Sequence, residues 1–159
     1  INKNVMNSRI TKPQLFTKPE TYNPIRPPVE KASTLIPDAY TSHDFFMIEQ
    51  EKVFANSWVA VGCVQKVNNP GDVLVVEVAG RSILIIRDQK QNLRAFYNVC
   101  RHRGSKLIED NCNIKKIICP YHAWTYNLDG SLKGARLMGK DFNKKDEVLN
   151  GIDYEYKYR

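Results

Sequence analysis

Two short pairs of cysteine and histidine constrain this chain more than any other feature of its sequence. The first pair is Cys100 and His102, separated by one residue. The second is Cys119 and His122, separated by two residues, and sixteen residues lie between the pairs. The whole chain has four cysteines and three histidines, so two of each fall in this one window. Because thiolate and imidazole are metal ligands, the sequence predicts a metal site built from these four side chains.

The way the ligands are shared between the pairs distinguishes kinds of metal site. Zinc sites with two Cys and two His usually pair Cys with Cys and His with His, whereas here each pair holds one of each. A mixed pair suits a [2Fe–2S] cluster with two Cys on one iron and two His on the other, because each loop then supplies one ligand to each iron. A zinc knuckle is the alternative. Cys112 lies between the pairs without a close partner and is not expected to be a ligand.

The motif and its flanks resemble the N-terminal Rieske domain of the large (alpha) subunit of ring-hydroxylating and related non-haem iron oxygenases. The resemblance covers roughly residues 40–140 and includes Asn98-Val99 before the motif and Asp129-Gly130 after it. Within the motif it rests on Cys100, His102, Gly104, Cys119, Pro120, Tyr121, His122 and Trp124.

This resemblance implies an electron-transfer role. In the family, the Rieske [2Fe–2S] cluster receives electrons from a reductase or ferredoxin. It passes them to a mononuclear Fe(II) in the catalytic domain of a neighbouring subunit, which activates O2 for substrate hydroxylation. A full-length homo-oligomer, a trimer, is therefore expected. The alternatives are a free-standing Rieske ferredoxin and a structural zinc module.

The substrate class is suggested by one part of the motif region. Residues 119–124, followed by 128–130 and 134–136, are similar to the branch that acts on choline, carnitine and glycine betaine. Aromatic-ring dioxygenases often have Gly at the position of Ala123. Monooxygenation and dioxygenation both stay open at this point.

Residues around the four expected ligands also have expected roles. Two residues should shape the loops and two aromatic residues should shield the cluster from water: Gly104, Pro120, Tyr121 and Trp124. Three basic residues beside the ligands are candidates for docking an acidic electron donor: Arg101, Arg103 and Lys106. The formal net charge of +7 is consistent with such a partner and also with an ordinary solvated surface.

Three positions predict where the reduction potential lies. High-potential Rieske proteins of cytochrome bc-type complexes have Cys where this chain has Ser105 and Tyr121, and these two Cys form a disulfide. They have Ser where this chain has Trp124. Without the disulfide and the Ser hydroxyl, we expect a potential in the lower part of the roughly −150 to +300 mV range of Rieske centres.

The hydrophobic pattern predicts a mainly β fold. Apolar runs bounded by turn signals place strands at residues 58–63, 72–78, 82–88, 93–98, 115–119, 124–127 and 131–133. Ala79-Gly80 and residues 128–130 are the turn signals of two hairpins. No βαβ rhythm is present, so antiparallel sheets are expected. The resemblance implies stacked antiparallel sheets with two cluster-binding loops, preceded by one short helix.

The helix is expected to run from Thr41 or Ser42, as its cap, to about Asn56. Residues seven apart should give it one apolar side: Phe46 and Val53, and Met47 and Phe54. We expect residues 1–40 to form an extended arm, 41–140 the Rieske domain, and 141–159 the start of a connection to a catalytic domain outside this chain. His43 is the only histidine outside the motif, so no mononuclear iron site is expected within these residues.

The remaining composition bounds partners and location. The chain begins at Ile1, which suggests a fragment or a processed form. No apolar run reaches the roughly 18–20 residues that span a membrane, and no secretory signal is recognisable. Nothing resembles a nucleic-acid-binding fold. A reducing compartment, the cytoplasm or an organelle stroma or matrix, is expected.

Overall fold

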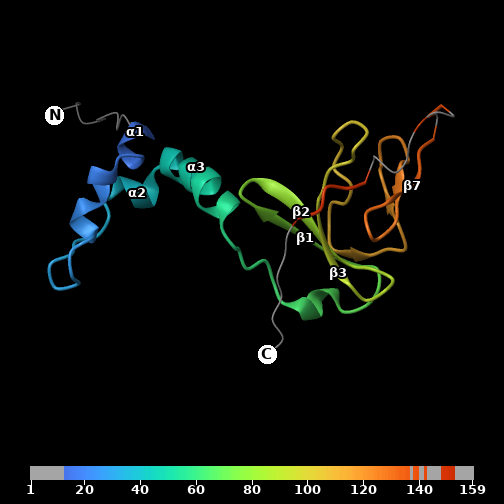
Figure 1. Cartoon of the computed structure of the whole chain (residues 1–159), viewed down its shortest axis with the longest axis horizontal. Helices are drawn as coiled ribbons and strands as arrows, with labels where there is room; N and C mark the ends of the chain where they lie inside the picture. Colours follow the sequence, from blue (N-terminus) through green and yellow to red (C-terminus); the bar gives the residue numbers. More distant parts are fainter. Residues whose placement is uncertain (1–12, 137, 140–141, 143–147, 153–159) are drawn as a thin grey trace, which may run out of the picture. The chain divides into compact units, whose positions relative to one another are not determined.

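The computed structural model describes residues 13–136, 138–139, 142 and 148–152 of the chain. The chain divides into two units, Ile1–Trp58 and Val59–Arg159. Figure 1 follows them in colour from the blue helices of the first unit to the orange strands of the second. All four expected ligands lie in the second unit, and each unit is described by itself.

The main element of the first unit is helix α3, His43–Lys52. Ser42 caps its N-terminus, because its side chain accepts a hydrogen bond from the backbone N–H of Phe45 at 3.3 Å. This confirms Ser42 as one of the two predicted caps, whereas the α-helix ends at Lys52 and a 3-10 turn, η2, covers Phe54–Asn56. Within the predicted extended arm lie three short helical segments: α1 at Pro13–Phe16, η1 at Pro19–Ile25 and α2 at Asp38–Thr41.

The predicted apolar side of this helix is not the side that packs. Phe46, Met47, Val53 and Phe54 are exposed. The buried residue is Phe45, whose ring lies 4.8 Å from the ring of Phe16 in α1. Spacing along the sequence identified a shared helix face, but the position of α1 decides which face is covered.

The second unit contains a four-stranded antiparallel sheet in the order β3-β2-β1-β4. Its strands are β1, Asp72–Val78; β2, Arg81–Arg87; β3, Leu93–Tyr97; and β4, Cys112–Asn113. The predicted two-residue turn joins β1 to β2, with positive φ angles at Ala79 (51°) and Gly80 (69°), as a tight hairpin requires. Figure 1 shows β1, β2 and β3 side by side.

A second antiparallel sheet has the order β5-β6-β7, with strands at Ile117–Ile118, Thr125–Tyr126 and Leu132–Gly134. Alternate residues of β2 face two different cores. Leu84 and Ile86 pack with Ile117 and Tyr126 of the second sheet, while Ile83 and Ile85 pack on the other face. Each such buried aliphatic side chain contributes about 1.5–3 kcal/mol. The predicted arrangement of antiparallel sheets is confirmed.

Two predictions about strands differ from the structure. Residues 58–63 form no strand, and Trp58 is 72% exposed; the helix η3, Val64–Val67, follows this segment instead. Strand β4 was not predicted, because its two residues carry no apolar pattern and pair only with the start of β1. Neither difference changes the two segments that carry the ligand pairs.

Candidate iron–sulfur site

The first ligand loop continues from the end of β3. Cys100 donates its N–H to the carbonyl of Ser105 at 2.8 Å, and Gly104 donates to the carbonyl of Cys100 at 3.0 Å. Gly104 has φ 69°, a left-handed conformation that glycine adopts without a steric penalty. A Cβ at Gly104 would meet no atom within 4 Å, so the backbone angle alone favours glycine here.

The second ligand loop is the turn between β5 and β6 and repeats this pattern. Cys119 donates to the carbonyl of Trp124 at 2.8 Å, and Ala123 donates to the carbonyl of Cys119 at 3.0 Å. Ala123 has φ 57°, so an alanine occupies the left-handed position that a glycine occupies in the first loop. A left-handed non-glycine residue costs about 1–2 kcal/mol. Pro120 lies at the start of this turn and is exposed.

The two loops bring like ligands together. Cys100 and Cys119 are both 2% exposed, and their thiols lie close enough to shift each other's pKa. The rings of His102 and His122 lie 4.8 Å apart at 69°. Each loop thus contributes one side chain to a Cys pair and one to a His pair. Within the described part of the chain, no group of three or more His, Cys, Asp or Glu side chains is arranged to hold a single metal ion.

Burial and backbone N–H groups act on the pKa of both thiols in opposite directions. Burial is the largest influence on Cys100 and raises its pKa. Burial also acts to raise the pKa of Cys119, but the backbone N–H groups of Tyr121 and His122 favour its thiolate, and the net direction is downward. Backbone N–H groups directed at sulfur stabilise negative charge there, which a cluster ligand requires.

Two buried polar atoms at the site lack a hydrogen-bond partner: His122 Nδ1 and Trp124 Nε1. A buried polar group without a partner is rare and costs about 1–3 kcal/mol. An imidazole nitrogen that is buried and unpaired, on the same loop as the buried thiol of Cys119, is suited to bind iron. The donor set therefore fits a [2Fe–2S] group with two Cys and two His ligands.

Aromatic rings cover the histidines on two sides. The indole of Trp124, 2% exposed, stacks on His102 with centroids 4.7 Å apart and a 9° angle. Phe142 meets Trp124 at 5.3 Å. Tyr121 lies 3.8 Å from His122 but is itself 61% exposed. Trp124 is thus a core residue, while Tyr121 lies at the surface.

Tyr126 links the two loops, and the sequence reasoning missed it. It lies on β6 and is fully buried, with its hydroxyl 3.4 Å from Cys100 Sγ. The same hydroxyl accepts the backbone N–H of Arg101 at 3.1 Å. Burial raises the pKa of Tyr126, so the phenol keeps its proton. The sequence signal that could have identified Tyr126 is the alternation of buried and less buried residues along 124–126, which places Tyr126 on the same inward side as Trp124.

The three basic residues near the loops are exposed but differ in their contacts. Lys106 Nζ pairs with Glu109 Oε2 at 2.6 Å. Arg101 Nη1 donates to Asn150 Oδ1 at 3.4 Å. Arg103 is exposed on the first loop. An exposed ion pair is weak and can open for a partner, so all three side chains remain accessible to an acidic surface.

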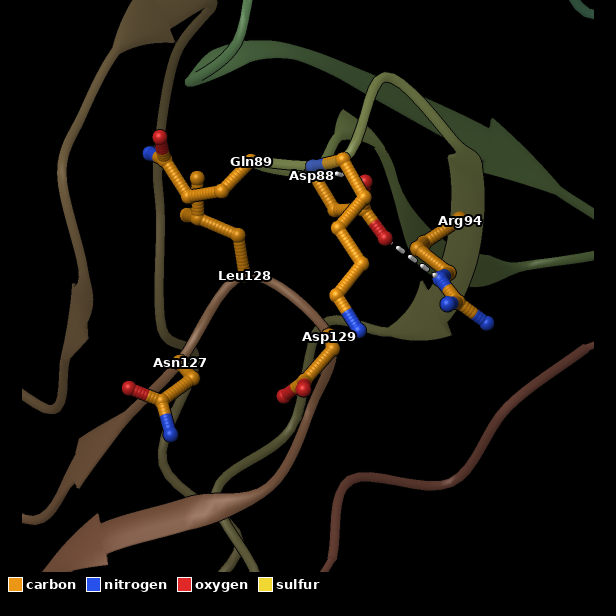
Figure 2. Close-up of a pocket in the computed structure, with 7 residues that line it drawn as sticks. Asp88, Gln89, Arg94, Asn127, Leu128 and Asp129 are labelled. Carbon is orange, nitrogen blue, oxygen red and sulfur yellow. Dashed lines mark hydrogen bonds and ion pairs between the residues drawn. The ribbon is translucent and has the colours of Figure 1, made fainter.

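A separate pocket of about 230 Å³ lies at the start of β3, whereas the first ligand loop follows the last residue of this strand. Figure 2 shows Asp88 and Arg94 on one side of it and Asn127, Leu128 and Asp129 on the other. Asp88 is 2% exposed and accepts Arg94 Nε at 3.0 Å, the contact drawn as a dashed line. Its oxygens are fully used by neighbouring donors, so the pocket lining is a structural network.

Comparison with known proteins agrees with this site. A family model described as "Rieske [2Fe-2S] domain" matches residues 57–147. The carnitine monooxygenase oxygenase subunit of Acinetobacter baumannii is 48% identical over 98 residues, which cover 61% of this chain and 26% of that protein. The glycine betaine monooxygenase oxygenase subunit of Pseudomonas aeruginosa is 36% identical over 115 residues, covering 71% of this chain and 27% of that protein.

A solved structure shows the same likeness in three dimensions. It is a quaternary ammonium Rieske monooxygenase whose study concerns carnitine oxidation and inter-subunit electron transfer. The match has a TM-score of 0.68 and 40% identity, and covers 74% of this chain and 33% of that chain. The chain thus spans between a quarter and a third of the length of these three relatives.

Proposed function

Because the chain belongs to the Rieske [2Fe-2S] domain family, we propose that it is the electron-transfer part of a non-haem iron oxygenase. The ligands in this proposal are Cys100, His102, Cys119 and His122. The observation that carries it is the convergence of two buried thiols with two adjacent imidazoles, one of which has a buried, unpaired Nδ1. A zinc knuckle is not supported, because the family matched binds iron and sulfide.

A bound [2Fe–2S] group with mixed Cys and His ligands would supply one-electron transfer at a higher potential than an all-Cys cluster. The residues of this chain prepare the site for it. Backbone N–H groups of the second loop favour the thiolate of Cys119. The Tyr126 hydroxyl lies against Cys100 Sγ. Trp124 and Phe142 exclude water from the side of His102.

The substrate in this proposal is a quaternary ammonium compound of the carnitine or glycine betaine type, and the reaction is a monooxygenation. Both sequence relatives described above carry such compounds in their names. The mononuclear Fe(II) that activates O2 would belong to a catalytic domain outside the described residues. If the coding sequence stops at Arg159 without a His-x4-His pair and a later carboxylate, a free-standing ferredoxin becomes the better interpretation.

The proposed partners are a reductase or ferredoxin and the catalytic domain of a neighbouring subunit in a trimer. Inter-subunit electron transfer in the similar monooxygenase supports the second partner. Arg101, Arg103 and Lys106 would face an acidic donor, so electron uptake should slow as ionic strength rises. In the described residues no helix is long and apolar enough to cross a membrane. Cys63 and Cys112, the two exposed cysteines that the proposal leaves as free thiols, suit the reducing interior of a cell or organelle.

The test is the metal content of protein purified without oxygen. Iron and acid-labile sulfide should each approach two per chain, and Cys100→Ser or Cys119→Ser should abolish both. Cys112→Ser is the matched control, since Cys112 is an exposed cysteine on β4 and should not affect either. Zinc in equal amount to the chain, without sulfide, would disprove the proposal.

A further inference from the structure

The necks of the two ligand loops are held together in different ways. The second loop connects β5 to β6, and both residues of β5 are paired with residues of β6. The first loop has no strand ladder at its neck. Among the described residues, its two sides are joined by one isolated bridge, between Val99 and Lys106, and by the backbone hydrogen bond from Cys100 to Ser105. Because few backbone hydrogen bonds hold such a neck, it would open easily without further support.

The side chain of Asn98 supplies that support. Asn98 is 1% exposed and stands at the base of the first loop. Its Oδ1 accepts the N–H groups of Leu107 and Ile108, each at 3.0 Å. Its Nδ2 donates to the carbonyl of Ile108 at 2.6 Å and to Ser82 Oγ on β2 at 3.0 Å. One amide therefore joins the start of the loop, its end and the sheet.

These bonds stand where the next rung of a hairpin would be. Cys100 pairs with Ser105 through its backbone, and Val99 bridges Lys106, so the next opposed pair is Asn98 and Leu107. The backbone N–H of Asn98 cannot complete this rung, because it donates to Ser82 on β2 at 2.9 Å. The side chain completes it instead. Asn98 does for the first loop what the β5–β6 ladder does for the second.

We propose that Asn98 is a positioning residue whose amide fixes the neck of the first loop and so sets where Cys100 and His102 present their ligand atoms. The inference rests on the proposed iron–sulfur function and adds a residue that does not touch the cluster. Loss of the amide would leave the buried N–H of Leu107 and the half-buried N–H of Ile108 without acceptors, which costs more than the hydrogen bonds contribute. The first loop alone should then loosen, because the second loop has its own ladder.

The first experiment measures backbone hydrogen exchange in the metal-free chain. In Asn98→Ala, amides of residues 99–108 should exchange at least tenfold faster than in wild type, whereas those of 117–126 should change less than twofold. Asn127→Ala is the matched control, since among the described residues Asn127 Nδ2 bonds only Ser131 Oγ, at 2.9 Å, in the β6–β7 turn. Equal acceleration of both loops in Asn98→Ala would overturn the proposal, because it would indicate a general loss of stability.

The second experiment uses the chain with its cluster. The electron paramagnetic resonance g values and the midpoint potential of the reduced cluster should shift in Asn98→Ala and in Asn98→Asp, and should not shift in Asn127→Ala. Unchanged g values and potential at full iron and sulfide content would overturn the proposal. If wild type binds no cluster, the proposed function fails, and the metal-free exchange measurement still decides whether Asn98 holds the loop.

A milder variant covers the case in which the Asn98 variants do not fold. Ser82→Ala removes one of the four side-chain hydrogen bonds and keeps the three that close the neck. Exchange at residues 99–108 should then rise by a smaller factor than tenfold, with no change at 117–126. An unchanged exchange rate in both loops would contradict the proposal that the bond from Asn98 to Ser82 on β2 helps to hold the first loop.

Discussion

Replacement of Tyr126 by Phe should lower the reduction potential of the cluster. The Tyr126 hydroxyl lies 3.4 Å from Cys100 Sγ. A thiolate bound to iron has no proton, so the tyrosine must be the donor in this contact. The hydroxyl also accepts the N–H of Arg101 at 3.1 Å, which polarises its O–H bond and strengthens the donor. The reduced cluster carries more negative charge on its sulfurs than the oxidised one, so the donor favours reduction.

The size of the effect follows from the energy of one hydrogen bond. A typical intramolecular hydrogen bond contributes about 0.5–1.5 kcal/mol. For a one-electron couple, a tenfold change in equilibrium is about 59 mV, which corresponds to about 1.4 kcal/mol. If the whole bond acts on the reduced state, the potential of Tyr126→Phe should lie about 20–65 mV below that of wild type.

The assay is a redox titration followed by electron paramagnetic resonance, with wild type and variant at equal iron content. Phe keeps the buried ring of Tyr126, which is packed in the core between the sheets, so the fold should persist. Tyr97→Phe is the matched control, because its hydroxyl contacts Arg81 at 3.3 Å and lies outside the site. A potential unchanged or raised in Tyr126→Phe would refute the reasoning that this hydroxyl donates to Cys100.

The remaining predictions concern stability. Gly104→Ala should destabilise the fold by about 1 kcal/mol through its positive φ alone. Ala123→Gly should leave stability unchanged or raise it, because the strain relieved at its positive φ offsets the added conformational freedom of the unfolded chain. Urea titration checks both, and equal losses would contradict the argument. Asp88→Asn should cost about 1–3 kcal/mol at neutral pH. Burial acts to raise the pKa of Asp88, but its hydrogen bonds from Asn92 and Arg94 prevail and lower it. The stabilisation is therefore complete above about pH 4 and lost as the pH falls through the folded pKa. A difference in the free energy of unfolding between Asp88→Asn and wild type that persists at acid pH would contradict this prediction.

Much of the site could be predicted from local sequence. The spacing of Cys100, His102, Cys119 and His122 identified the residues that converge, because two tight pairs on loops allow few other uses. Ala79-Gly80 identified the first hairpin, since only a few residues adopt its positive φ angles. The strands of both sheets lie where apolar runs predicted them, apart from residues 58–63 and the short β4.

Other predictions failed where a local pattern had more than one outcome. The helix at residues 43–52 has several apolar residues, and their spacing could not tell that Phe45 packs on Phe16 while Phe46 and Met47 stay exposed. Residues 58–63 are apolar enough for a strand but pair with no strand among the described residues. A strand forms only when a partner supplies its hydrogen bonds.

The sequence by itself determined the four candidate ligands, the hairpin turns and the mainly β class, because each depends on residues close together in the chain. Only the tertiary structure decided which side chains support the ligands. Tyr126 reaches Cys100 across 26 residues, and Trp124 stacks on His102 from the other loop. Asn98 closes the first loop through contacts nine and ten residues away. Local patterns specify how a segment folds, but a contact between distant segments depends on how both sheets bring their loops together.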